Sequence, residues 1–77
     1  METATPLDIE LTVFEEHRQE WSRKNLGKFK VIRGDTILEE FFDEYAVAFR
    51  AGLAAFGPHK IFLVKQIWKT EPVYFIA

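Results

Sequence analysis

A two-residue turn is the feature that most restricts the fold of this chain. Gly34-Asp35 separates two stretches rich in β-branched and aromatic residues, 28–33 and 36–42. Glycine beside aspartate is typical of the tight turn that joins two antiparallel strands. The pattern therefore predicts a β-hairpin in which four pairs of residues lie opposite one another: Arg33 and Thr36, Ile32 and Ile37, Val31 and Leu38, and Lys30 and Glu39.

A helix is predicted before the hairpin. Apolar residues and one arginine recur there at helical spacing, at Leu11, Phe14, Arg18 and Trp21. Thr12 and Glu15 form the capping box that is typical of a helix start, and Asp8 is an alternative cap. Gly27 is expected to end this helix, because glycine tolerates the left-handed backbone found there.

A second helix and two more strands are predicted after the hairpin. Asp43 is expected to cap a helix that runs to about Phe56, where Gly57-Pro58 stops it. The inward stripe predicted for this helix consists of Tyr45, Phe49, Leu53 and Phe56, and Gly52 is expected to allow a close approach to the sheet. Residues 60–68 are predicted to form a strand that is apolar on both faces, and residues 72–76 close a second hairpin.

The length of the chain allows one core. A chain of 77 residues buries too little surface to be divided into two domains, and without cysteine it has no disulfides to add stability. We predict a flexible segment at residues 1–10 and a single α+β domain at residues 11–77. Its element order is α-β-β-α-β-β. The four strands form a mostly antiparallel sheet in the order 2-1-3-4, with both helices on one face.

Composition excludes several classes of protein. The absence of cysteine excludes disulfide frameworks and thiolate zinc sites, and it favours a cytoplasmic location. The longest apolar run, residues 61–64, is far too short to cross a membrane, so no membrane association is expected. A formal charge of −2 disfavours a general nucleic-acid coat, which would have to neutralise many phosphates.

The residue types that carry chemistry are present, but their spacing does not suit catalysis. His17 lies near Glu16 and Glu20, yet a hydrolytic metal site needs three protein ligands at suitable spacing. Adjacent carboxylates point to different sides of a helix or strand. Arg33-Gly34-Asp35 spells an integrin-binding tripeptide, but it coincides with the predicted turn. We therefore predict no enzyme activity and no catalytic, cofactor-binding or metal-binding residues.

Several short segments share their combined spacing with a known family: Phe14-Glu15-Glu16-His17-Arg18 with Trp21, Gly27-Lys28-Phe29, Phe42-Asp43, Ala51-Gly52, Phe56-Gly57 and Leu63-Val64-Lys65-Gln66-Ile67. Over about residues 11 to 76 the chain resembles a family of small prokaryotic proteins that is catalogued only as a domain of unknown function. The resemblance implies a bacterial or archaeal cytosolic protein and no particular chemistry. It also implies a polar tail beyond the position of Ala77, where this sequence ends.

The predicted register places many apolar residues on one sheet face. Charged residues are rarely buried, so we expect Lys30, Glu39 and Lys65 to point away from the helices. Side chains two positions apart on a strand lie on the same face, so the neighbours of these residues at that spacing must also point away from the helices. That face is the predicted interface, made of Ile32, Ile37, Leu63, Lys65, Ile67, Val73 and Phe75. We therefore predict a non-catalytic protein–protein interaction module, acting as a homodimer or as a small partner subunit of another cytosolic protein.

The alternative function is binding of RNA or DNA on the sheet. Basic and aromatic residues on the strands could gather on one surface, as in proteins that bind single-stranded RNA. These residues are Lys28, Lys30, Arg33, Lys65, Lys69, Trp68 and Tyr74. Glu39 and Glu71 lie on the same strands and oppose this function electrostatically.

Overall fold

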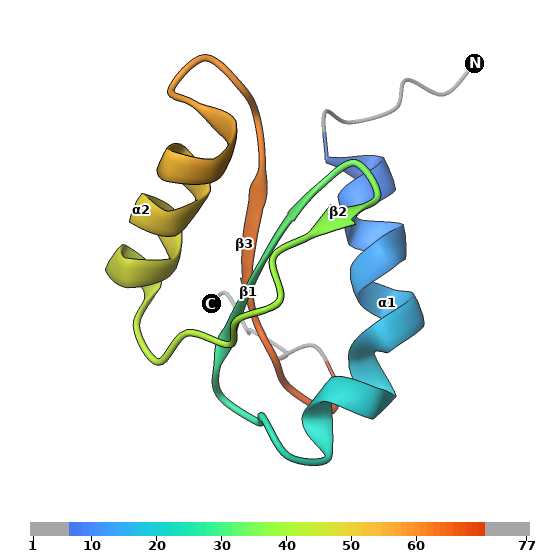
Figure 1. The fold of residues 1–77 in the computed structure, drawn as a ribbon. Helices are drawn as coiled ribbons and strands as arrows, with labels where there is room; N and C mark the ends of the chain where they lie inside the picture. Colours follow the sequence, from blue (N-terminus) through green and yellow to red (C-terminus); the bar gives the residue numbers. More distant parts are fainter. Residues whose placement is uncertain (1–6, 71–77) are drawn as a thin grey trace, which may run out of the picture.

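A computed structural model describes residues 7–70 of the chain (Figure 1). It confirms an α+β architecture with two helices and an antiparallel sheet of three strands in these residues. The elements in chain order are α1 (Asp8–Ser22), β1 (Phe29–Arg33), β2 (Thr36–Ile37), α2 (Tyr45–Phe56) and β3 (Leu63–Gln66).

The hairpin forms in the predicted register over its first pairs. Ile32 lies opposite Ile37 and Arg33 opposite Thr36, and Gly34 in the turn has a φ of +62°. The second strand is shorter than predicted, because β2 ends at Ile37 and only an isolated bridge joins Phe29 to Phe42. Continuing the hairpin register would pair residue 29 with residue 40, so the chain bulges by two residues before Phe42.

α1 differs from the prediction at both ends. It begins at Asp8 and not near Thr12, whose hydroxyl donates a hydrogen bond to the Asp8 carbonyl oxygen inside the helix. Residues 8–10 therefore belong to the folded domain and not to a flexible segment. The helix ends at Ser22, before Gly27, which has a φ of +87° in the connection to β1 and donates its N–H to the Ile67 carbonyl oxygen.

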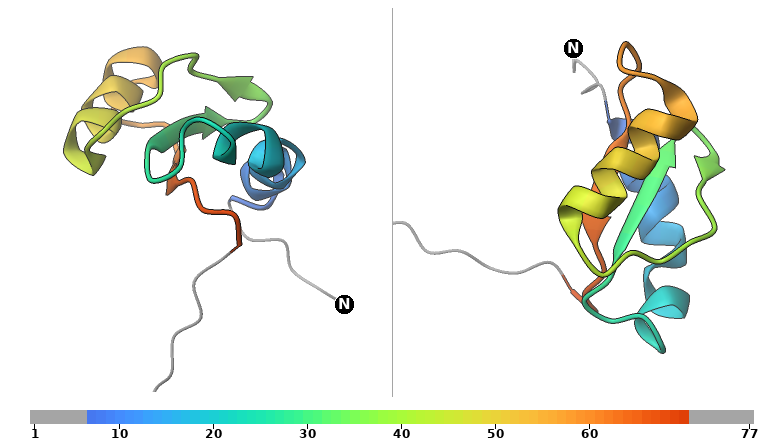
Figure 2. Two further views of the ribbon diagram at one scale, coloured as in Figure 1. Left: turned by 90° about the horizontal axis from the view of Figure 1, so that it is seen from below. Right: turned by 60° about the vertical axis from the view of Figure 1, so that its left-hand side comes forward.

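The two helices cover opposite faces of the sheet, so the prediction of both helices on one face is wrong (Figure 2). Three consecutive residues of β1, 30–32, are buried, and side chains of consecutive strand residues point to opposite faces. Ile32 packs in a cluster with Phe14 and Trp21 of α1. Phe29 lies on the other face, where its ring contacts Tyr45 of α2.

The sheet has the order β2-β1-β3. β3 pairs antiparallel with β1, which places Leu63 opposite Ile32 and Lys65 opposite Lys30. Only one edge of β3 has a strand partner within residues 7–70. The predicted fourth strand, residues 72–76, lies outside the described residues and stays a prediction, as does the full order 2-1-3-4.

α2 rests on the sheet through small residues and not through the predicted aromatic stripe. The two buried residues of this helix are Ala48 and Gly52. A methyl group in place of the Gly52 hydrogen would overlap the ring of Phe62, so glycine is what allows this close approach. Of the predicted inward stripe, Tyr45 and Phe49 are exposed, whereas Leu53 and Phe56 are half-buried.

Candidate interaction surface

The residues predicted to form the interface do share one sheet face, but α1 covers that face. Ile32 and Ile67 are 0% exposed and form the core cluster with Phe14 and Trp21. Ile37 and Leu63 pack against the same cluster, and the Lys65 ammonium lies 5.4 Å from the centre of the Phe14 ring. The expectation of an open face at these five positions is therefore wrong. Val73 and Phe75 lie outside the described residues.

Three of the exposed large apolar residues lie on α2, and the others are scattered over the described chain at Ile9, Leu11, Leu26, Ile61 and Trp68. Seven of the twelve residues of α2 are exposed, and we call these the α2 surface: Tyr45, Ala46, Val47, Phe49, Arg50, Ala54 and Ala55. The large side chains expose 54% of Tyr45, 43% of Val47 and 41% of Phe49. Arg50 is the one charged residue of the helix. A helix that is apolar on nearly all sides is typical of one that is covered on more than one side.

A row of ring contacts holds these aromatic side chains in place. Tyr45 contacts Phe29 at a centroid distance of 6.0 Å and stacks on Phe49 at 6.2 Å. Phe62, just before β3, contacts Phe49 at 5.6 Å and Phe56 at 5.8 Å. The exposed rings of Tyr45 and Phe49 therefore each contact at least one other ring of the domain.

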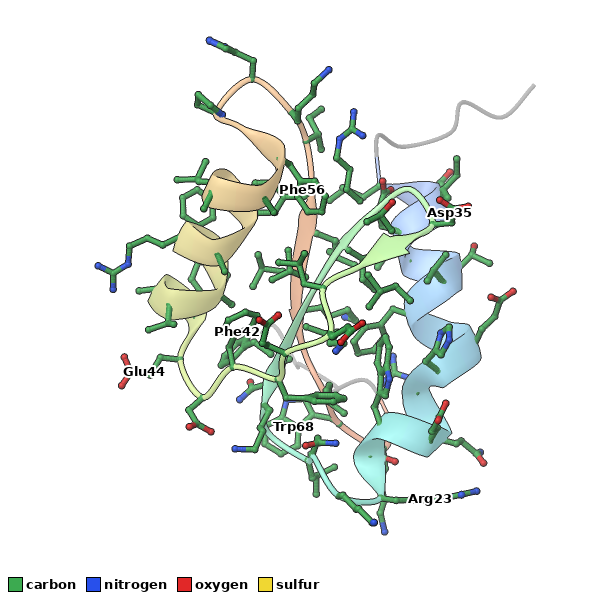
Figure 3. All side chains as sticks on the ribbon, viewed as in Figure 1. Arg23, Asp35, Phe42, Glu44, Phe56 and Trp68 are labelled. Carbon is green, nitrogen blue, oxygen red and sulfur yellow. The ribbon has the colours of Figure 1, made fainter. Side chains whose placement is uncertain are left out.

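The two ends of α2 carry opposite charges. Asp43 and Glu44 are exposed just before the helix, and Asp43 forms an ion pair with Lys28. His59 and Lys60 are exposed in the loop after the helix. Figure 3 shows Glu44 at one end of α2 and Phe56 near the other. The α2 surface is therefore an apolar strip with an acidic end and a basic end.

A groove lies on the other face, beside Lys30. Its volume is about 640 Å³. It is lined by His17, Glu20, Trp21, Arg23, Lys24, Asn25, Lys30, Ile37, Glu39 and Phe41.

Lys30 itself is 2% exposed, and its ammonium donates to the carbonyl oxygens of Glu39 at 2.8 Å and Glu40 at 3.2 Å. The same ammonium lies 3.8 Å from the centre of the Phe41 ring. These contacts make Lys30 an anchor for the chain between β2 and α2.

Burial lowers the pKa of the Lys30 ammonium, and the carboxylates of Glu40 and Glu39 oppose this shift. Between the lowered pKa and the ordinary value of about 10.4, the unfolded chain binds more protons at this lysine than the folded chain does. The stability contributed by this residue must therefore rise with pH in that window.

We expect this rise to disappear when Lys30 is replaced by methionine. Urea unfolding of both proteins from neutral pH to about 10.4 measures it. The free energy of unfolding of the wild type should increase relative to that of Lys30→Met as the pH is raised. All other ionisable groups are the same in both proteins, so the difference isolates Lys30. A difference that stays constant or falls with pH contradicts the burial argument.

His17 is a packing residue in this structure. Its Nδ1 lies 2.9 Å from the Val13 carbonyl oxygen, to which it donates, and its ring stacks on Trp21 at 4.8 Å. Within residues 7–70, no three His, Asp or Glu side chains are grouped so that they could hold a metal ion.

The basic and aromatic residues of the nucleic-acid alternative are not brought onto one open surface. Lys30 is buried, Lys28 is paired with Asp43, and Lys65 lies near Phe14 on the face that α1 covers. Helices cover both faces of the sheet, so neither face is open for bases to stack on it. Tyr74 lies outside the described residues.

Glu10 is a buried polar residue that the sequence pattern did not reveal. It is 7% exposed, and its Oε2 accepts a hydrogen bond of 2.6 Å from the Gly34 N–H. Its Oε1 is buried and has no hydrogen-bond partner among residues 7–70. Glu10, and not the exposed Leu11, shares the buried helix face with Phe14, Arg18 and Trp21. A glutamate on a helix usually lies in solvent, so the residue type does not indicate that Glu10 is buried and binds the Gly34 N–H.

Comparison of the chain with family models, curated proteins and solved structures gave no match. The resemblance to a small prokaryotic family therefore stays a prediction. Neither helix in residues 7–70 has the length and apolar character needed to cross a bilayer.

Proposed function

We propose that this protein is a non-catalytic protein–protein interaction module that binds its partner through the α2 surface. One observation carries the proposal: α2 buries its small residues Ala48 and Gly52 and exposes Tyr45, Val47 and Phe49. Apolar surface that is contiguous and exposed on a small protein usually marks an interaction site.

The other helix of the same domain supports this interpretation by contrast. α1 buries Phe14 and Trp21, and most of the residues it exposes are ones that water solvates well, among them Glu15, Glu16, Gln19 and Glu20. Its exposed apolar residues, Ile9 and Leu11, lie in its first turn. α1 therefore has the amphipathic pattern of a helix with one side in water. α2 has twelve residues and a single charge, so its outer side lacks that pattern.

Site-specific photo-crosslinking in cells that naturally produce the protein tests the proposal. A photoreactive phenylalanine analogue at Val47 reports on the α2 surface, and the same analogue at Glu16 reports on the exposed side of α1. We expect a discrete protein adduct from position 47 and none from position 16. Equal adducts from both positions, or none from position 47, contradict the proposal.

Two finer features are proposed with it. We infer that residues 72–76 add a fourth strand to the open edge of β3, because this segment is apolar and follows β3 after a short connection. Slow hydrogen exchange of alternate amides in this segment would support the strand. We also infer a cytoplasmic location, which the absence of cysteine favours. Cell fractionation tests that location.

A further inference from the structure

We propose that the partner is a second copy of this chain, and that two α2 surfaces pack antiparallel around a two-fold axis. This inference rests on the proposed function, since it names the partner of the same surface. A two-fold interface uses the same patch on both subunits, so the patch must be complementary to itself.

The charges at the two ends of α2 meet that requirement. An antiparallel arrangement brings the acidic end of one helix, at Glu44, to the basic end of the other, at Lys60 of the partner subunit. The same pairing occurs twice because of the two-fold symmetry. The opposed helix dipoles also favour this arrangement over a parallel one.

The order of residue sizes along α2 fits the same register. If position 44 lies opposite position 60, the midpoint is Gly52, and each residue lies opposite the position at an equal distance beyond that midpoint. Phe49 then lies at the height of Ala55 of the partner subunit, Arg50 at the height of its Ala54, and Tyr45 at the height of its His59. Two of the three larger side chains therefore lie level with alanines, which favours close packing of two helices.

A charge-exchange experiment tests both the partner and the orientation. Glu44→Lys and Lys60→Glu each replace two attractive contacts with two repulsive ones in a homodimer. In a mixture of the two variants, one subunit carries lysine at both positions and the other carries glutamate at both. Analytical ultracentrifugation and native mass spectrometry measure the dimers of the wild type, each variant and the equimolar mixture.

We expect the wild type to dimerise and each variant alone to dimerise about tenfold more weakly. The mixture should form heterodimers about as tightly as the wild type. High salt should reduce the differences, because exposed charges are screened. Glu16→Lys on α1 is the matched control: it makes the same charge change outside the interface and should dimerise as the wild type does.

The outcomes separate this inference from the proposed function. A wild type that stays monomeric at high micromolar concentration, while position 47 crosslinks to a different protein, overturns the dimer and retains the interaction module. A wild-type dimer whose variants do not recover on mixing overturns the antiparallel register. A monomer without any adduct at position 47 overturns both proposals.

Discussion

Replacing Trp21 by alanine is expected to remove about 3–5 kcal/mol from the free energy of unfolding. The Trp21 ring is 7% exposed and contacts Phe14 at a centroid distance of 5.6 Å and Phe41 at 6.2 Å. It also lies beneath His17 and 5.4 Å from the Lys30 ammonium. The substitution therefore removes the centre of the α1 core and one contact to the chain between β2 and α2, the one with Phe41.

Native domains are typically stable by only about 5–15 kcal/mol, and a chain of 77 residues without disulfides is expected at the lower limit, so a loss of this size should remove most of its stability. Thermal and urea unfolding followed by far-UV circular dichroism measure the loss. Trp68→Ala is the matched control, because it removes the same side chain from an exposed position and should cost about 1–2 kcal/mol. A Trp21→Ala protein that keeps the melting temperature of the wild type is incompatible with the core assignment.

The parts of the fold that depend on local chemistry could be predicted from the sequence. The turn at Gly34-Asp35 and the pairs next to it follow from the backbone freedom of glycine, so the register was correct at Ile32 and Ile37. The bulge before Phe42 could not be predicted in this way. It depends on the Lys30 ammonium, which binds two carbonyl oxygens from residues that a regular strand would have paired.

The prediction of an open sheet face is wrong because of how it treats two lysines. It places Lys30 and Lys65 on a face in contact with solvent, since charged residues are rarely buried. In the structure, the hydrocarbon stem of Lys30 lies under α1, and its charge is satisfied by carbonyl oxygens and aromatic rings. A lysine on a strand therefore did not indicate which face a helix covers. The apolar character of β3 on both faces was the better guide.

The candidate site was missed for a related reason. Periodicity cannot orient a helix whose residues are nearly all apolar, and the largest residues, Tyr45 and Phe49, were assumed to face inward. Steric fit determines the orientation instead, because only Ala48 and Gly52 allow α2 to approach Phe62 and the sheet. Glycine at position 52 predicts a close approach to the sheet, but only the position of Phe62 against it shows that Ala48 and Gly52, and not Tyr45 and Phe49, face the sheet.

Replacing Ile32 by lysine is expected to abolish the cooperative unfolding transition. Ile32 is 0% exposed and is surrounded by hydrocarbon from Phe14, Trp21 and Ile67. The substitution removes buried apolar area and places an ammonium in this cluster, which together cost several kcal/mol. Lys30, on the same face, is tolerated because it reaches two carbonyl oxygens. Circular dichroism during urea unfolding measures the result.

Val47→Lys is the matched control, because it introduces the same charge on the α2 surface. Val47 is 43% exposed, so the new ammonium stays in water and the stability should change by less than about 1 kcal/mol. This variant should keep a cooperative transition and lose its partner. The opposite result would be an Ile32→Lys protein that unfolds cooperatively and differs from the wild type only in its oligomeric state. In that case α1 would not cover this face in solution, and the open sheet surface predicted from the sequence would be the interface.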